Sequence, residues 1–415
     1  MPNWEDRVDP QFDFTKDSYS VSHEISPYEN DYYAHQIYKK MQPYDGILFS
    51  LSNVQTKLKI KYDQNNQPMI RNKANIRDYL KIPKYSRLKV MGDCGAYSYV
   101  AYHDPPPFYS VTHVAELYHE FKFDFGVSPD HIAAGFIRFK EKGKKKYVKL
   151  STKEQERRRK LTVQNSEEFI NLVKEKHYSF KVIGAAQGYS TKSYIESVKS
   201  LISQGYEYIA LGGLVQYNNA ELLKILQKVA PYTEGKNLHL FGVMRSGHIA
   251  NFEKLGVTSF DSASYFRKAW LRSGQNYLAQ DGVWYSAIRV PFSWNKNLLK
   301  NANDSNISLQ DLENLETQAY DSLLRYSDEK LSIDTVLSSV IKYDKLLMRN
   351  SENIENIKIK YRKTLEKKPW EDCECEICQE HGIEVMIFRG TNRNKRRGYH
   401  NTWIFRNKMM NSSHF

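Results

Sequence analysis

The chain has 415 residues, enough for one to three domains, and a formal net charge of +13. Hydrophobic residues make up 40% of it and no run of 18 apolar residues occurs, so we expect no membrane span. The first residues, MPNWEDRVDPQFDF, lack the basic and then apolar layout of a secretory signal, which favours the cytoplasm. The positive charge and the 30 tyrosines favour a nucleic acid as partner, although a basic protein without that role remains an alternative.

Residues 1–44 are expected to form an irregular, tyrosine-rich lead-in. From residue 45 onward, short apolar runs alternate with stretches of helical pattern, as in an α/β barrel or a doubly wound sheet. Two such stretches, 191–205 and 219–230, predict helices, and the first can begin at Ser190 or Thr191 and end at Gly205. The predicted strands are ILFSLS (47–52), RLKVMG (87–92), KVIGAA (181–186), YIALGG (208–213), LHLFGV (238–243) and VTSFDS (257–262).

A strongly basic stretch, residues 138–160, interrupts this alternation with 12 Lys/Arg against 3 Glu. It is either a solvated loop or helix face, or an arm that contacts phosphates. The residues that we expect to contact nucleic acid in the second case are Lys144, Lys145, Lys146, Arg157 and Arg158.

Beyond residue 295 the chain becomes polar and helical in pattern, and we expect a barrel-type domain over 45–295 followed by a helical and metal-binding subdomain over 296–415. A second basic cluster falls within the latter, in the run from Arg389 to Arg397, and it is also available for DNA binding by its charge.

Three of the four cysteines, Cys373, Cys375 and Cys378, lie within six residues. This spacing does not suit disulfides but allows the thiolates to surround one tetrahedral Zn²⁺, with His400 or the nearer His381 as fourth ligand. Four protein ligands make a closed, structural zinc site. The alternative is a chance cluster of free thiols.

Polar residues follow the predicted strands one after another. Asp93, Gln187, the Gly212–Gly213 pair and Asp261 each come at or just after a strand end, and the segment FKFDFGVSPD adds Asp124 and Asp130. A single aspartate of this kind is more often a turn former or a helix cap. In a barrel, however, the carboxyl ends of all strands meet at one mouth, where active sites are built.

These motifs, in order, resemble the tRNA-guanine transglycosylase family: D-C-G-A-Y, D-x-G-V-x-x-D, A-Q-G, L-G-G-L, F-G-V, G-V-x-x-F-D-S and CxCxxC with a later His. The resemblance covers roughly residues 45–400. It implies a (β/α)8 TIM-type barrel with an appended zinc-binding subdomain. It also implies exchange of guanine in a polynucleotide for a 7-deazaguanine base.

The roles implied by the resemblance can be assigned position by position. Asp261 matches the nucleophile that attacks C1′ of the target nucleotide, and Asp93 matches the acid/base carboxylate. The metal ligands become Cys373, Cys375, Cys378 and His400, which favours His400 over His381. The residues that match base-recognition groups are Asp130, Gln187, Gly212 and Gly213, with Tyr97 and Phe241 on the two faces of the base.

Two departures from the tRNA enzymes affect substrate reading. Their D-S-G-G-[FY]-Q is Asp93-Cys94-Gly95-Ala96-Tyr97-Ser98 here, and their P-T-R keeps only Arg267, another candidate nucleic-acid contact. Together with the basic stretch at 138–160, these differences resemble the DNA-directed, DpdA-type branch, whose members insert a base such as preQ0 (7-cyano-7-deazaguanine) into DNA alongside partner proteins. A tRNA-acting enzyme and a non-catalytic nucleic-acid-binding subunit are the alternatives.

Overall fold

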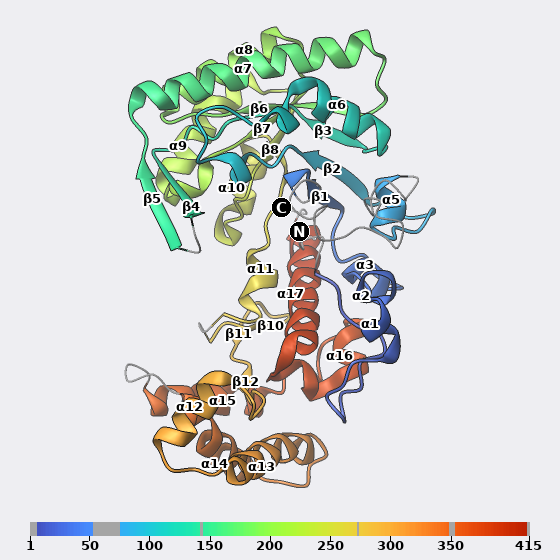
Figure 1. Ribbon diagram of the computed structural model, residues 1–415, viewed down its shortest axis with the longest axis vertical. Helices are drawn as coiled ribbons and strands as arrows, with labels where there is room; N and C mark the ends of the chain where they lie inside the picture. Colours follow the sequence, from blue (N-terminus) through green and yellow to red (C-terminus); the bar gives the residue numbers. More distant parts are fainter. Residues whose placement is uncertain (1–5, 53–74, 142–143, 272–273, 348–352, 413–415) are drawn as a thin grey trace. The chain divides into compact units, whose positions relative to one another are not determined.

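The computed structural model describes residues 6–52, 75–141, 144–271, 274–347 and 353–412 (Figure 1). The chain divides into two compact units. The barrel unit is built on Asp45–Ala263, and the helical unit combines the described residues of Glu5–Tyr44 with those of Ser264–Phe415. The helical unit is therefore discontinuous in sequence, and the barrel unit is inserted into it.

Seven parallel strands form the sheet of the barrel unit, and they lie side by side in the order in which they occur in the chain. They are β1 (Gly46–Ser50), β2 (Lys89–Asp93), β3 (Phe125–Val127), β6 (Lys181–Ala186), β7 (Tyr208–Leu211), β8 (Asn237–Leu240) and β9 (Val257–Phe260).

This strand order decides between the two predicted α/β folds. A doubly wound sheet reverses its strand order at a switch point, whereas a TIM-type barrel adds each new strand to the same edge. The sequential order therefore confirms the barrel type, and the described residues supply seven strands of the expected eight. The six predicted strands are confirmed, and β3 is a further strand, within the segment noted above only for its aspartates.

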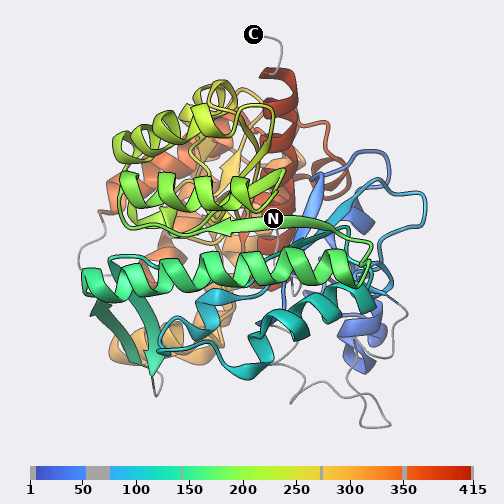
Figure 2. The ribbon, with the colours of Figure 1, turned by 90° about the horizontal axis from the view of Figure 1, so that it is seen from above.

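Helices pack along the outer side of this sheet. Figures 1 and 2 show α6 (Val111–Glu120), α7 (Thr152–Glu175), α8 (Thr191–Ser203) and α9 (Asn219–Val229) side by side. The shorter helices of the unit are α5 (Ile76–Tyr79) and α10 (Ile249–Lys254). The apolar faces of α8 and α9 meet the strands in one buried cluster, which holds the sheet and the helices together.

Local sequence explains the ends of α8. The Ser190 hydroxyl accepts a hydrogen bond from the Ser193 N–H and so caps the first turn, which confirms Ser190 over Thr191. Gly205, two residues beyond the helix, has a φ of +91°, a left-handed conformation that favours glycine. The strands also need two glycines, because a Cβ on Gly92 or Gly126 would lie 2.2 or 2.5 Å from the ring of Tyr118.

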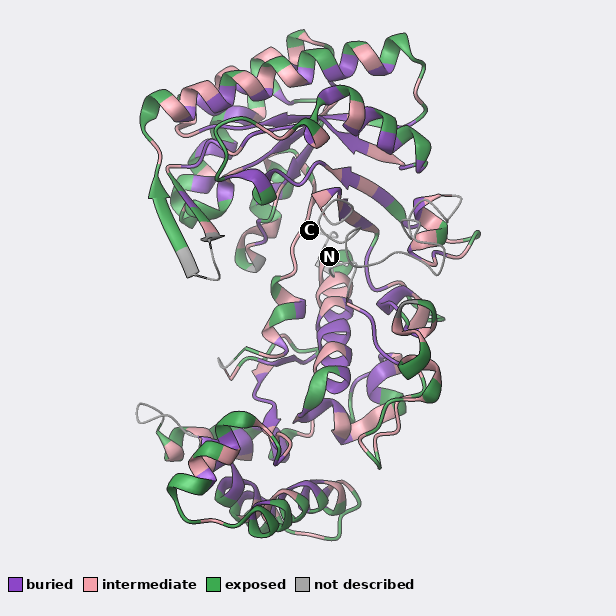
Figure 3. Cartoon of the chain, viewed as in Figure 1, coloured by how far each residue is buried: buried purple, intermediate pink, exposed green. Residues whose placement is uncertain are grey.

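The basic stretch 138–160 is neither a loop nor a single helix face. Its first part belongs to an antiparallel hairpin of β4 (Phe136–Glu141) and β5 (Lys144–Lys149), and its second part begins helix α7. Figure 3 shows the described part of the hairpin as largely exposed. The hairpin projects from the barrel unit in Figure 1.

In its described residues, the helical unit contains the remaining α-helices and four two-residue strands. None of the helices in the described ranges combines the length and the apolar composition that a membrane crossing requires. The elements are α1 (Val21–Ile25), α2 (Pro27–Asn30), α3 (Ala34–Ile37), α11 (Ser264–Lys268), β10 (Tyr277–Leu278), β11 (Trp284–Tyr285), β12 (Ile288–Arg289), α12 (Lys296–Asp304), α13 (Leu309–Ser327), α14 (Ile333–Asp344), α15 (Ile354–Lys367), α16 (Glu376–His381), β13 (Ile387–Phe388) and α17 (Gly390–Ser412).

The arginines between Arg389 and Arg397 are buried, which corrects the suggestion that this cluster could serve DNA. Arg393 is 1% exposed; its guanidinium pairs with Glu384 and Asp17 and donates to the Phe14 carbonyl. Arg397 is fully buried and donates to backbone carbonyls, including that of Ala269 at 2.7 Å. Arg393 thus holds the lead-in to helix α17, and Arg397 holds α17 to the segment at Ala269.

Candidate active site

Three aspartates occupy the carboxyl-terminal edge of the sheet. Asp93 is the last residue of β2, Asp130 follows β3 by three residues, and Asp261 directly follows β9. Side-chain oxygens of Asp93 and Asp130 lie within 4.8 Å of one another. Asp124, by contrast, precedes β3, and its carboxylate pairs with Lys89 at 3.1 Å, so it belongs to the opposite edge.

Asp130 is buried and its carboxylate is held by two neighbouring side chains. Gln187 donates from Nε2 to Oδ2 at 2.5 Å, and the Cys94 thiol donates to Oδ1 at 3.2 Å. The Tyr99 hydroxyl donates to the Asp130 carbonyl at 2.6 Å, which fixes the backbone as well. Burial raises the pKa of Asp130, although the two side-chain hydrogen bonds act in the opposite direction.

Asp93 has a strongly raised pKa. Burial and repulsion from the charge of Asp130 raise it to about 7, against the lowering effect of hydrogen bonds from the Gly95 N–H and from Ser50. The Gly95 N–H donates to Asp93 Oδ2 at 3.1 Å, and the φ of Gly95 is +87°. A carboxyl with this pKa can both give and take a proton near neutral pH.

Asp261 is shifted in the other direction. Burial opposes ionisation, but the hydrogen bond and electrostatic interaction with His239, together with a hydrogen bond from the Gly242 N–H, hold the pKa of Asp261 below its usual value. The Gly242 N–H donates to Oδ1 at 2.8 Å, and His239 Nε2 lies 3.3 Å from the same oxygen. At neutral pH Asp261 is therefore ionised, whereas Asp93 is protonated in part of the molecules, an arrangement that suits one carboxyl as the acid and the other as the nucleophile.

His239 is a site residue that the sequence analysis missed. It lies on β8 at 2% exposure, and its Nδ1 is 2.6 Å from the Ser259 hydroxyl, which in turn is 2.6 Å from the hydroxyl of Tyr208. This chain of hydrogen bonds orients the imidazole toward Asp261. The available signal was a histidine between two leucines of a predicted buried strand.

The glycine pair after β7 allows Gln187 to approach. A Cβ on Gly212 would lie 2.2 Å from Gln187 Nε2, and one on Gly213 would lie 3.0 Å from its Oε1. The Gly212 N–H already donates to the Ala186 carbonyl, and the Gly212 carbonyl accepts from the Tyr194 hydroxyl. Of the two predicted glycines, Gly213 is thus the better placed to offer an N–H to a ligand.

Tyr97 and Phe241, the two side chains predicted to stack on the base, both belong to the barrel unit. Tyr97 lies on a short 3₁₀ helix (Ala96–Tyr99). Its side chain is 65% exposed, so its ring is accessible for stacking on a base. Phe241 follows β8, and its ring meets that of His239 edge-on at 4.8 Å. Their placement around one base remains a prediction.

The residues predicted to contact nucleic acid are not equivalent. Arg158 is 3% exposed and donates to the carbonyl oxygens of Val100, Ile132 and Tyr102, so it is an internal residue and not a DNA contact. Arg157 forms salt bridges with Glu154 and Asp104. Lys146 and Arg267 are exposed, and the side chains of Lys144 and Lys145 lie outside the described part of the chain.

The predicted metal ligands meet in the helical unit. Nδ1 of His400 lies 3.5, 3.3 and 3.4 Å from the sulfurs of Cys373, Cys375 and Cys378, and all four residues are buried. A tetrahedral Zn²⁺ would separate sulfur and nitrogen ligands by about 3.6 Å, so the set fits a metal of this kind. His400 Nε2 is 2.8 Å from the Leu278 carbonyl, a contact that orients the ring. His381 is not part of this cluster and packs against Phe14.

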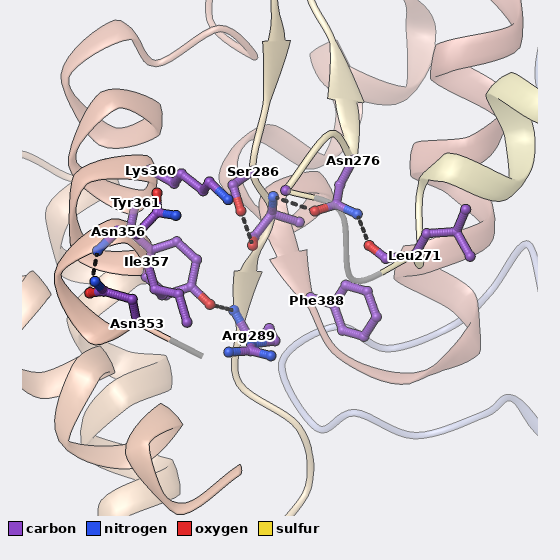
Figure 4. Close-up of a pocket in the computed structure, with 12 residues that line it drawn as sticks. Leu271, Asn276, Ser286, Arg289, Asn353, Asn356, Ile357, Lys360, Tyr361 and Phe388 are labelled. Carbon is purple, nitrogen blue, oxygen red and sulfur yellow. Dashed lines mark hydrogen bonds between the residues drawn. The ribbon is translucent and has the colours of Figure 1, made fainter. Parts of the chain in front are cut away.

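The helical unit also contains a cavity of about 280 Å³, and none of the predicted site residues lines it (Figure 4). Its polar lining is largely bonded to itself: Asn276 donates to the Leu271 carbonyl at 2.7 Å, and the Tyr361 hydroxyl accepts from the Arg289 N–H at 3.2 Å. The lining therefore serves the packing of the unit, and we place the chemistry at the three aspartates.

Comparison with known proteins identifies the family of this chain. The family described as queuine tRNA-ribosyltransferase matches residues 145–410. A DNA-guanine transglycosylase from Salmonella montevideo is 34% identical over 421 residues, which cover 99% of this chain and 95% of that protein. Because the match to the family extends over more than half of the chain and the relative aligns with nearly all of it, the chain belongs to the queuine tRNA-ribosyltransferase family.

Proposed function

We propose that this protein exchanges guanine in DNA for a 7-deazaguanine base, with preQ0 as the expected base. The observation that carries the proposal is the pair of strand-end aspartates whose pKa values are shifted in opposite directions, Asp93 upward and Asp261 downward. The choice of DNA is supported by the name of the relative that aligns with nearly the whole chain, a DNA-guanine transglycosylase.

The proposed exchange has two halves. In the first, a carboxylate oxygen of Asp261 bonds to C1′ as the C1′–N9 bond breaks, and Asp93 gives its proton to the departing guanine. In the second, Asp93 takes the N9 proton of the incoming base, whose nitrogen bonds to C1′ and releases Asp261. Protons and electrons balance over the two halves, so the exchange consumes no further reactant.

The base-recognition roles follow from donor and acceptor chemistry. The Asp130 carboxylate can accept from the N1–H and N2–H₂ groups of guanine, and the Gly213 N–H can donate to O6. Tyr97 and Phe241 would cover the faces of a base removed from the DNA stack. The Cys₃His cluster would hold a structural Zn²⁺, and the protein would act in the cytoplasm with partner proteins of a DNA modification system.

The test is incorporation of labelled preQ0 into duplex DNA, single-stranded DNA and bulk tRNA in parallel. Label in DNA alone supports the proposal. Label in tRNA alone supports the second candidate, a tRNA-acting enzyme, which the description of the matched family favours. Label in none, with binding of DNA retained, supports a non-catalytic subunit.

The pH profile of the first half-reaction should follow Asp93. Its carboxyl must carry a proton to give to guanine, so kcat/KM for DNA is expected to be flat on the acid side and to fall about tenfold per pH unit above about 7. Asp261, whose pKa is lowered, stays ionised throughout this range. Asp93→Asn should remove the descending limb; a rate that rises through pH 7 would contradict the acid role.

Gly212→Ala should weaken recognition of the base. The new Cβ would lie 2.2 Å from Gln187 Nε2 and displace the carboxamide from Asp130. We expect KM for the incoming base to rise about 10- to 100-fold, the cost of one hydrogen bond to a charged group. Gly247→Ala is the matched control, since its Cβ would meet open space. An unchanged KM in the first variant would remove Gln187 from base recognition.

A further inference from the structure

The two parts of the basic stretch 138–160 differ in how their charge is balanced. In α7, Arg158 pairs with Glu154 and Arg159 with Glu156, and the hydrogen bonds from Arg157 and Arg158 lower the pKa of Glu154 to about 2. The hairpin 136–149 has seven Lys or Arg residues and one carboxylate, Glu141. The sequence of the hairpin therefore carries a large excess of positive charge, which attracts a polyanion.

The hairpin is also amphipathic. Ile137 is buried and Phe139 is partly buried on one face. Neighbours in a strand point to opposite faces, so the pairs Phe136–Lys149 and Arg138–Tyr147 share the other face. That outer face is exposed: Phe136 is 63% and Tyr147 is 66% accessible, and the Arg138 guanidinium lies 5.5 Å from the centre of the Tyr147 ring. Cations and aromatic rings therefore alternate on one exposed surface.

The base of the hairpin is anchored to the loops that carry the base-recognition groups. The Gly135 N–H donates to Gln216 Oε1 at 2.9 Å, and Gln216 lies three residues after Gly213. The Ala133 N–H donates to Gln187 Oε1 at 3.4 Å, and Gln187 in turn holds Asp130. The hairpin thus begins at the candidate active site.

The length and the width of the hairpin both match features of duplex DNA. Two six-residue strands extend about 20 Å, which is rather more than half of the roughly 34 Å helical turn of DNA. The major groove admits a two-stranded ribbon. Phosphate contacts by cations supply most of the sequence-independent affinity for DNA, and aromatic side chains add stacking on unpaired bases.

We propose that the outer face of this hairpin, formed by Phe136, Arg138, Tyr147 and Lys149, binds the substrate DNA beside the exchanged guanine, within about half a helical turn. The inference rests on the proposed function for the identity of the substrate. Arg138 and Lys149 contact phosphates, and Tyr147 and Phe136 pack against sugars or unstacked bases. The hairpin positions DNA and takes no part in bond breaking.

The test compares two double variants that remove the same charge: Arg138→Ala with Lys149→Ala on the hairpin, and Lys224→Ala with Lys228→Ala on the exposed side of α9. Affinity for a duplex with one target guanine is measured as a function of salt. For the hairpin variant, the negative slope of log K against log salt concentration should be smaller in magnitude by about 2, one unit for each phosphate contact removed. Its KM for DNA should rise about tenfold or more, with kcat at saturating DNA within about twofold of the parent. The α9 variant should match the parent.

Two further variants separate charge, stacking and folding. Arg138→Lys keeps the charge and should keep the slope, and Tyr147→Ala should weaken binding about tenfold at every salt concentration with the slope unchanged. Equal slopes for the hairpin variant and the parent, or equal losses in both double variants, would overturn the inference. So would a loss confined to RNA. If the parent binds DNA without exchanging guanine, the proposed function fails, while the slopes still decide the role of the hairpin.

Discussion

Asp261→Asn is expected to abolish base exchange while leaving DNA binding intact. The carboxylate is held by the Gly242 N–H and by His239, and these contacts keep its pKa low and fix its position, as the proposed role of nucleophile requires. An amide of the same shape cannot form the bond to C1′, so the rate should fall about 10⁴-fold or more. Label transfer from preQ0 to DNA measures the rate, and a covalent protein–DNA adduct on a denaturing gel should form with the parent alone.

Asp124→Asn is the matched control for this experiment. Asp124 is also an aspartate next to a strand, but it precedes β3 and pairs with Lys89. Its exchange rate should stay within about threefold of the parent, as for a substitution away from the reacting atoms. Exchange at the parental rate by Asp261→Asn would place the nucleophile elsewhere, and loss of DNA binding by that variant would show a structural role.

Cys375→Ser is expected to release the metal and destabilise the helical unit. Cys375 is fully buried, its sulfur accepts the Cys378 N–H at 3.3 Å, and the sulfur lies 3.3 Å from Nδ1 of His400. Since a structural metal contributes its binding free energy to folding, we expect a loss of more than about 3 kcal/mol. Calorimetry should show an earlier transition for the helical unit, and metal analysis should show less than one bound zinc.

Cys94→Ser supplies the control for the metal experiment. It makes the same chemical change in the barrel unit, where the Cys94 sulfur lies near Asp130 and far in sequence from the Cys₃His cluster. Its zinc content and the transition of the helical unit should be those of the parent. A Cys375→Ser protein with a full complement of zinc and unchanged unfolding would contradict the assignment of Cys375 as a ligand.

The sequence predicted features that depend on local pattern. The strands of the barrel unit are apolar runs, Ser190 caps a helix by its own hydroxyl, and the CxCxxC spacing brings three thiols to one point. Asp93 and Asp261 were found because each stands at the end of a predicted strand, and parallel strands bring their ends together, whereas Asp130 was assigned from the family motif. Such signals lie within a few residues of each other.

Features that depend on partners far away in the sequence could not be predicted from such local patterns. Arg393 looked like a surface cation because nothing near it in sequence indicates its burial; it pairs with Asp17 and Glu384. His239 acquires its role only when β8 and β9 place it beside Ser259 and Asp261. The β4–β5 hairpin was missed because its lysines obscure the alternation of Phe136 to Phe139.

The discontinuity of the helical unit has a consequence for the order of events during synthesis. Asp17 leaves the ribosome early, yet its partner Arg393 follows 376 residues later. At about 5–20 residues per second, that is a delay of roughly 20 to 75 s. All of Asp45–Ala263 emerges in the interval, so the barrel unit can fold while the residues before it still lack their partners.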